Sequence, residues 1–145
     1  MEIRKATIYD IRQIYDMLIE MHSQAEIKLS PIKPEKLFMT IKMALEEGIV
    51  FVAEKGNRIV GSIAGLISSD WWSEKEFLKD LWFYVFPENR KSNIAIKLVK
   101  SFIKFAKSVK LKIKVGHVFS GDIERKDKFF KYLGLEKAGS LYVEI

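Results

Sequence analysis

A short polar turn near the middle of the chain is the segment best suited to chemistry. The apolar segment Leu81–Phe86 ends at Pro87, and an amphipathic segment begins a few residues later, at about Ser92. No acidic residue occurs from Asn89 to Gly121. Backbone N–H groups at the start of a helix, in positive surroundings, can hold a phosphate group. The turn therefore predicts a phosphate-binding loop.

The composition is that of one soluble domain. The chain has 145 residues, of which 48% are hydrophobic and 30% charged, enough to build a core. The absence of cysteine excludes disulfides, thiol catalysis and cysteine-based metal sites. No apolar run reaches the roughly 20 residues that span a bilayer, and nothing resembles a signal peptide, so we expect a cytoplasmic protein without membrane partners. The net charge of +6 favours anionic partners, such as a phosphorylated cofactor or nucleic acid.

The hydrophobic pattern predicts an α/β (α+β) fold with a mixed central sheet covered by helices. Thr7 and Asp10 have the spacing of a capping box, Pro34 suits the first turn of a helix, and 55–58 suits a hairpin turn. We expect strands at about 2–6, 49–54, 59–67, 77–86, 111–119 and 140–145, and helices at about 8–22, 34–48, 92–109 and 122–133.

This order of elements, with the residues from Val85 to Leu98, resembles the GNAT superfamily of N-acetyltransferases. Ile3–Ile11 is similar to the family's first strand and helix start, Ile59–Gly61 to part of its hairpin, and Phe129–Leu135 to its closing signature. The likeness covers the whole chain. It implies one GNAT-like domain over residues 1–145, with a mostly antiparallel sheet of about six or seven strands, about four flanking helices, and acetyl-CoA as the cofactor.

The family's pyrophosphate signature reads Arg/Gln-x-x-Gly-x-Gly/Ala. Arg90 and Ala95 match its ends, but Asn93 replaces the middle glycine, and Lys91 replaces the glycine that often follows the arginine. Backbone N–H groups do the binding, and Asn tolerates positive φ better than most residues, so we expect cofactor binding with altered loop geometry or weaker affinity. The cofactor-binding residues implied are Phe83, Tyr84, Val85, Arg90, Lys91, Ser92, Asn93, Ile94, Ala95 and Phe130.

The catalytic positions match the family less well. The family's usual general acid is a Tyr four residues before Gly134, where this chain has Phe130, which has no proton to donate. Tyr132 is the candidate acid, although it lies about 200° around the helix from Phe130; a ring packed on the core is the other interpretation. Asp80 is the candidate base, because the family often has a carboxylate on this strand; an exposed hairpin charge is the alternative.

In the implied mechanism, an amine attacks the thioester carbonyl directly in a ternary complex, and a backbone N–H near Phe83–Val85 polarises that carbonyl. The acceptor is a small-molecule or protein amine that the sequence does not identify, and family habit implies a homodimer. Other residues have both a functional and a structural interpretation. Trp71 and Trp72 could line the acceptor site, form a dimer contact or pack on the sheet, and the acidic residues Asp70, Glu74, Glu76 and Asp80 could attract a cationic amine or belong to a solvated loop. His117 lies beside the cofactor or is an ordinary strand residue, and the row Lys97, Lys100, Lys104 and Lys107 is the solvated face of a helix.

Three functions therefore stand beside one another. The first is an acetyl-CoA-dependent N-acetyltransferase. The second is a GNAT-like domain that binds CoA without efficient transfer, which Phe130 and the missing glycines favour. The third is a basic nucleic-acid-binding module, which the charge suggests, although no helix-turn-helix, zinc or RNP-like motif accompanies it.

Overall fold

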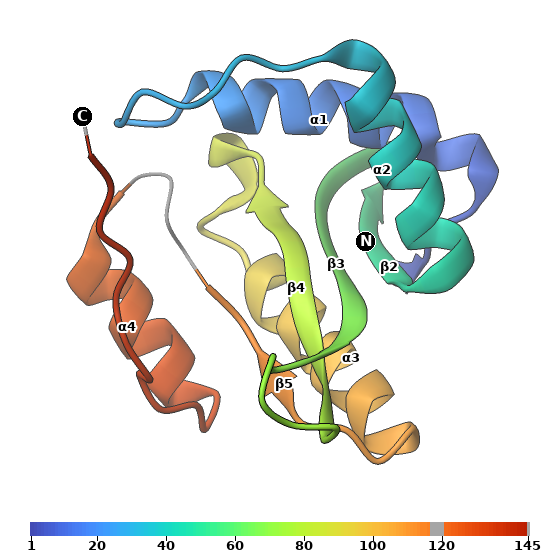
Figure 1. Ribbon diagram of the computed structural model, residues 1–145. Coiled ribbons are helices and arrows are strands. Elements are labelled where there is room, and N and C mark those ends of the chain that lie inside the picture. The colour runs from blue at the N-terminus through green and yellow to red at the C-terminus, as the bar shows by residue number, and fades with distance from the viewer. Residues whose placement is uncertain (117–120, 145) are drawn as a thin grey trace.

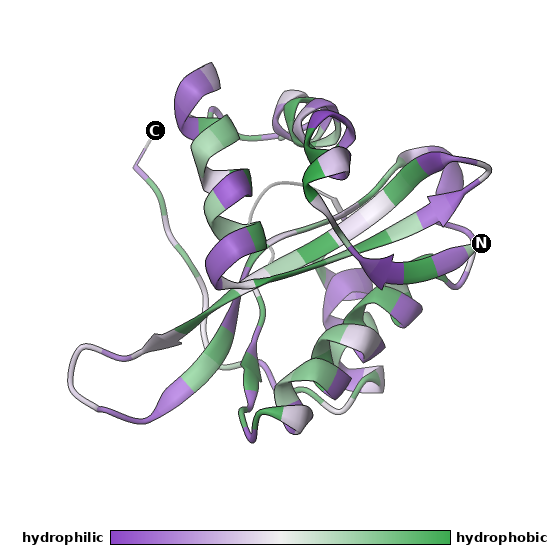
Figure 2. Ribbon diagram, turned by 90° about the vertical axis from the view of Figure 1, so that its right-hand side faces the viewer, coloured by the Kyte–Doolittle hydropathy of each residue, from purple (hydrophilic) through white to green (hydrophobic). Residues whose placement is uncertain are grey.

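The computed structural model describes residues 1–116 and 121–144, and within them a central sheet lies between two helical layers. Five strands are arranged in the order β1-β2-β3-β4-β5, antiparallel except for the parallel pair β4 and β5. Helices α1 and α2 cover one face and α3 the other, as Figures 1 and 2 show. The elements are β1 (Glu2–Lys5), α1 (Ile11–Ser23), α2 (Pro34–Glu47), β2 (Ile49–Lys55), β3 (Arg58–Ser69), β4 (Glu76–Val85), α3 (Ile94–Ser108), β5 (Ile113–Lys114) and α4 (Ile123–Tyr132), with 3₁₀ turns at Ile8–Asp10 and Pro87–Asn89.

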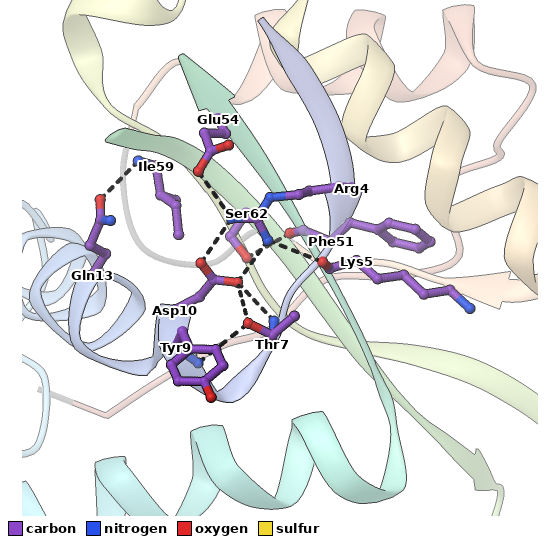
Figure 3. Close-up of polar contacts among 10 residues, drawn as sticks. All are labelled: Arg4, Lys5, Thr7, Tyr9, Asp10, Gln13, Phe51, Glu54, Ile59 and Ser62. Carbon is purple, nitrogen blue, oxygen red and sulfur yellow. Dashed lines mark hydrogen bonds and ion pairs between the residues drawn. The ribbon is translucent and has the colours of Figure 1, made fainter. Parts of the chain in front are cut away.

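The predicted capping box is confirmed, and it forms part of a larger polar network (Figure 3). The Thr7 N–H donates to Asp10 Oδ2 at 2.7 Å, and the Thr7 hydroxyl accepts from the Tyr9 N–H at 3.3 Å. Arg4 donates to both oxygens of Asp10 at 2.8 and 2.9 Å and to Glu54 at 3.1 Å. The hydrogen bond from Arg4 is the main cause that lowers the pKa of Asp10. The network joins β1, β2 and the start of α1.

The core lies on both faces of β2 and β3. Ile49–Ala53 is a run of buried residues, as expected for a strand covered on both sides. On α3, Leu98, Val99 and Phe102 are fully buried, while Lys97 and Lys100 are exposed. The amphipathic face predicted for this helix is therefore confirmed.

Two glycines allow the backbone of the core to pack closely. A Cβ atom on Gly48 would lie 2.2 Å from the carbonyl oxygen of Gly65. A Cβ atom on Gly65 would lie 2.6 Å from the ring of Phe102. Both contacts are far closer than van der Waals distance, so these positions bring the end of α2 and the start of β2 against β3, and α3 against the sheet.

The fold class is confirmed, but the strand count is lower than expected. The described residues contain five strands, not six or seven. The strand predicted at 140–145 is not formed over residues 140–144, which are exposed. Their alternating apolar pattern favours a strand, but strand propensity depends on a neighbouring strand to pair with. The strand predicted at 111–119 is paired only at Ile113–Lys114, and 117–120 and Ile145 lie outside the described residues.

Candidate active site

The sheet opens between β4 and β5. These strands pair only at Leu78 with Ile113 and Lys79 with Lys114 in the part of the chain that the structure describes. On its other side, β4 stays paired with β3 as far as Val85. A bulge lies between these two regions, because Gly65 pairs with Asp80 and Ala64 with Trp82, which leaves Leu81 without a partner. A bulge bends its strand and increases the local twist, so the β5 side of β4 beyond Leu81 is an edge that no described residue of β5 covers.

The backbone groups on this edge follow from the strand geometry. The Phe86 N–H donates to the Val60 carbonyl of β3 at 3.0 Å. Because N–H groups alternate in direction along a strand, those of Phe83 and Val85 point the other way, to the uncovered edge. The Val85 carbonyl on the same edge accepts from Arg90 Nε at 2.8 Å. An extended ligand could thus accept hydrogen bonds from Phe83 and Val85.

The turn after β4 presents a second set of N–H groups. The Ile94 N–H donates to the Ser92 hydroxyl at 3.3 Å, and the first intrahelical hydrogen bond runs from the Lys97 N–H to the Asn93 carbonyl at 3.0 Å. The N–H groups of Ala95 and Ile96 lie between these two, in the turn where helical N–H groups have no intrahelical acceptor. No acidic residue occurs in this turn. The geometry is that of an anion site at a helix N-terminus.

The residues that replace glycine in this loop do not need glycine's conformational freedom. Asn93 has φ −87° and ψ 14°. The positive-φ residues of the described chain are Asn57, Lys110 and three glycines, all outside 90–95. The backbone of Lys91 and Asn93 is therefore ordinary for residues with side chains.

Arg90 lies between the turn and the strand edge. Besides the Nε hydrogen bond to Val85, its guanidinium lies over the ring of Tyr84, 5.2 Å from the centroid. Lys126 of α4 is close enough for the charge of Arg90 to help lower its pKa, although burial contributes more. Arg90, Lys126 and the exposed Lys91 give this end of the site a positive potential, which favours an anion.

Tyr84 links the strand edge to α1. Its hydroxyl lies 3.0 Å from Glu20 Oε2 and 2.7 Å from Gln24 Oε1. Burial, followed by the hydrogen bond to Glu20, raises the pKa of Tyr84 to about 12. The hydroxyl is therefore protonated at neutral pH. Sequence reasoning did not find Glu20 or Gln24, since no local pattern connects residues that lie 64 and 60 positions from Tyr84.

An aromatic cluster holds α4 against β4. Phe83 stacks on Phe129 with centroids 6.1 Å apart, and meets Phe130 edge-on at 6.4 Å. Phe129 and Phe130 are 5.2 Å apart. The position at which the family signature has a tyrosine is therefore part of an apolar wall beside the uncovered edge.

The structure separates the two predicted catalytic residues. The Asp80 carboxylate accepts from Lys79 Nζ and from the Gly116 N–H at 3.2 Å, so it lies where β4 and β5 diverge. Its side chain is only 8% exposed. Tyr132 is 74% exposed and lines an open groove of the surface with Leu133, Gly134 and residues of α3. Asp80 is thus near the split, and Tyr132 faces α3 instead.

The remaining candidates lie elsewhere. Trp71 and Trp72 are 92% and 66% exposed at the tip of the β3–β4 hairpin, roughly 30 Å along β4 from the turn at Arg90. Two of the four acidic residues predicted to attract a cation have lysine partners: Asp70 pairs with Lys114 at 3.2 Å, and Asp80 pairs with Lys79. His117 lies outside the described residues.

Two further kinds of feature are absent from residues 1–116 and 121–144. No group of three or more histidine or acidic side chains there is arranged to hold a metal ion. No helix there is both long enough and apolar enough to cross a membrane.

One known protein family matches most of this chain. The model of the acetyltransferase (GNAT) family matches residues 11–134. None of the curated protein sequences is similar enough to count as a match.

Solved acetyltransferase structures share the fold over nearly the whole chain. A predicted acetyltransferase with acetyl-CoA from Clostridium acetobutylicum has a TM-score of 0.78 at 16% identity, covering 99% of this chain and 94% of its own. An aminoglycoside 6'-N-acetyltransferase from Acinetobacter haemolyticus has 0.74 at 14%, covering 100% and 97%. Glucosamine-6-phosphate N-acetyltransferase from Arabidopsis thaliana has 0.73 at 15%, covering 99% and 97%. At these identities the likeness concerns the fold.

Proposed function

Because this chain belongs to the acetyltransferase (GNAT) family, we propose that it is an acetyl-CoA-dependent N-acetyltransferase, a single domain over residues 1–145 that acts on an amine in a ternary complex. The observation that carries the proposal is the uncovered edge of β4, which leads directly into a basic turn and the free N-terminal N–H groups of α3. An extended ligand that leads into a pyrophosphate matches the order of these hydrogen-bond donors along the strand edge and the helix start.

The residues present fit acetyl-CoA. The N–H groups of Phe83 and Val85 can pair with the amide groups of the pantetheine arm as an added strand does. The N–H groups of Ala95 and Ile96 can hold the pyrophosphate, and Arg90 and Lys91 bring positive charge to it. Phe130, with its aromatic neighbours, provides an apolar wall beside the arm.

The transfer chemistry depends mainly on position. Acetyl-CoA, when bound, supplies a thioester whose carbonyl carbon is attacked by the amine nitrogen, so that a C–N bond forms while the C–S bond breaks and the sulfur keeps the electron pair. The Phe83 N–H can polarise the carbonyl. Asp80 can take the amine proton, directly or through water, since a carboxylate accepts more hydrogen bonds than the two that Asp80 makes with described residues. A thiolate is a good leaving group, so an acid at position 130 is not required.

The first experiment measures cofactor binding by thermal melting. A ligand at 100 times its Kd stabilises the folded state by about 2.7 kcal/mol, and for 145 residues this corresponds to a rise in Tm of roughly 9 °C. Arg90→Glu should reduce the rise. The matched control is Arg12→Glu, because Arg12 is an exposed arginine on α1 that pairs only with Asp16 in the described chain.

Two outcomes would count against the proposal in different ways. No change in Tm at millimolar acetyl-CoA would exclude cofactor binding. A clear rise in Tm without release of free CoA in the presence of any amine would leave a CoA-binding domain that does not transfer.

A further inference from the structure

The contacts of the Tyr84 hydroxyl define a hydrogen-bond chain directed towards α1. A tyrosine hydroxyl has one proton to donate, yet it lies within hydrogen-bond distance of two side-chain oxygens, Glu20 Oε2 at 3.0 Å and Gln24 Oε1 at 2.7 Å. A carboxylate can only accept, whereas the oxygen and nitrogen of an amide can be exchanged by a flip. The consistent arrangement has Gln24 donating to Tyr84 and Tyr84 donating to Glu20.

This arrangement fixes the Glu20 carboxylate without neutralising it. A hydrogen bond from a neutral hydroxyl leaves the negative charge in place, and the raised pKa of Tyr84, about 12, means that the donor keeps its proton across the working range of pH. Glu20 is half-buried at the last turns of α1. The other oxygen of its carboxylate can therefore accept from a ligand.

The charges around Tyr84 come from two directions. Arg90 comes from the turn before α3, whereas Glu20 comes from α1. Arg90 affects the Tyr84 hydroxyl less than Glu20 does. Under the proposed function, the cofactor phosphates compensate Arg90, so the carboxylate of Glu20 is the charge that remains for the acceptor.

The position of Glu20 selects which group of the acceptor it can bind. The attacking amine must be neutral and must lie beside the thioester, at the edge of β4 near Phe83. The carboxylate proposed to take the proton of that amine is Asp80, where β4 and β5 diverge. Glu20 instead lies beyond the whole Tyr84 side chain and a hydrogen bond of 3.0 Å from the strand, and is therefore suited to a second ammonium group of the same molecule.

We propose that Glu20, positioned by Tyr84 and Gln24, anchors a second ammonium group of the acceptor, so that the acceptor is a diamine or a larger polycation. The inference rests on the proposed function, because it needs the reacting amine at the edge of β4. It makes Glu20 a specificity-determining residue and Tyr84 a positioning residue.

The test compares three small amines by isothermal titration to the protein saturated with CoA. The probes are 1,4-diaminobutane, a dication; butylamine, a monocation; and 4-aminobutyrate, an amine with a carboxylate. We expect 1,4-diaminobutane to bind about tenfold more tightly than butylamine, the usual effect of one charge-assisted hydrogen bond. Glu20→Gln should abolish the preference, and Tyr84→Phe should reduce it. Asp16→Asn is the control, since Asp16 is a carboxylate one helical turn earlier with a side chain that is 60% exposed.

Equal affinities for 1,4-diaminobutane and butylamine in the wild-type protein would overturn the inference. So would tighter binding of 4-aminobutyrate, or a preference that survives Glu20→Gln. The Tm rise with acetyl-CoA is measured separately on the same preparations. A Tm rise without the diamine preference would remove the anchor and leave the proposed function, whereas a preference without a Tm rise would remove the proposed function.

Discussion

Replacement of one buried hydroxyl tests whether the face of β4 next to the bulge is fixed by polar contacts. Ser62 of β3 is completely buried. Its hydroxyl donates to the Phe51 carbonyl at 2.8 Å and accepts from Trp82 Nε1 at 3.0 Å. Trp82 directly follows Leu81, the residue without a partner in the bulge. In Ser62→Ala the indole N–H of Trp82 stays buried and loses its acceptor.

The expected cost follows from that single orphaned donor. A buried hydrogen-bonding group without a partner costs about 1–3 kcal/mol. With an unfolding entropy of roughly 2.1 cal/mol/K per residue, the 145 residues give about 0.3 kcal/mol/K. A loss of about 2 kcal/mol therefore lowers Tm by about 7 °C. Ser68→Ala is the control, because Ser68 lies on the same strand and is exposed.

A double-mutant cycle separates this cause from a general loss of packing. Trp82→Phe removes the N–H that Ser62→Ala would leave unpaired, so the two changes together should cost less than their sum by about 1–2 kcal/mol. The variants are compared by urea denaturation and thermal melting. The reasoning is refuted if Ser62→Ala lies within 0.5 kcal/mol of the wild type, or if the two changes are additive.

Three other predictions concern packing, pH and the acid position. Gly48→Ala should lower the free energy of unfolding by more than about 3 kcal/mol or prevent folding, because the new Cβ would lie 2.2 Å from a β3 carbonyl oxygen. The control Gly139→Ala places its Cβ where nothing lies within 4 Å, so its Tm should equal that of the wild type. Arg4 lowers the pKa of Asp10 from its usual 3.8, so the stability that Asp10 contributes is present above that pH and is lost as the pH falls through the lower pKa of the folded state. The wild type should therefore be more stable than Asp10→Asn in urea denaturation, and this difference should shrink below about pH 4. A difference that does not change with pH would contradict the role of the charge. Tyr132→Phe should leave turnover within twofold, because the side chain is 74% exposed on the α3 side; a hundredfold fall in kcat would restore it as the acid.

Local signals in the sequence were enough for most of the fold. The capping box at Thr7, the proline at the start of α2 and the lysine face of α3 each depend on residues within one or two helical turns. The segment 140–144 has an equally clear local pattern but forms no strand, since a strand also requires a partner that is distant in the sequence. The start of α3 was predicted two residues too early, because the Ser92 hydroxyl accepts from the Ile94 N–H in the turn before the helix.

The candidate site divides in the same way. The strand, the turn and the helix start at 83–95 are contiguous, so their order alone predicted the site that we propose for an anion. The contacts of Tyr84 with α1 and the bonding of Asp80 to Gly116 join segments that the sequence does not relate. The charge at the hairpin also depends on contacts that the local sequence does not show, since lysines pair with Asp70 and Asp80 and reduce their acidic field.

The replacements in the family motifs fall on side chains, whereas the site that we propose consists mainly of backbone groups. Lys91 and Asn93 occupy glycine positions, but the backbone there has no positive φ, so neither replacement removes or redirects the N–H groups of the first turn of α3. Phe130 lacks the hydroxyl of a tyrosine but packs against Phe83, the residue whose N–H lies on the uncovered edge. That N–H is directed by the bulge at Leu81, which depends on the pairing of β3 and β4. Binding and carbonyl polarisation should thus survive all three replacements, and an acid at position 130 is the part of the family chemistry that Phe130 cannot supply.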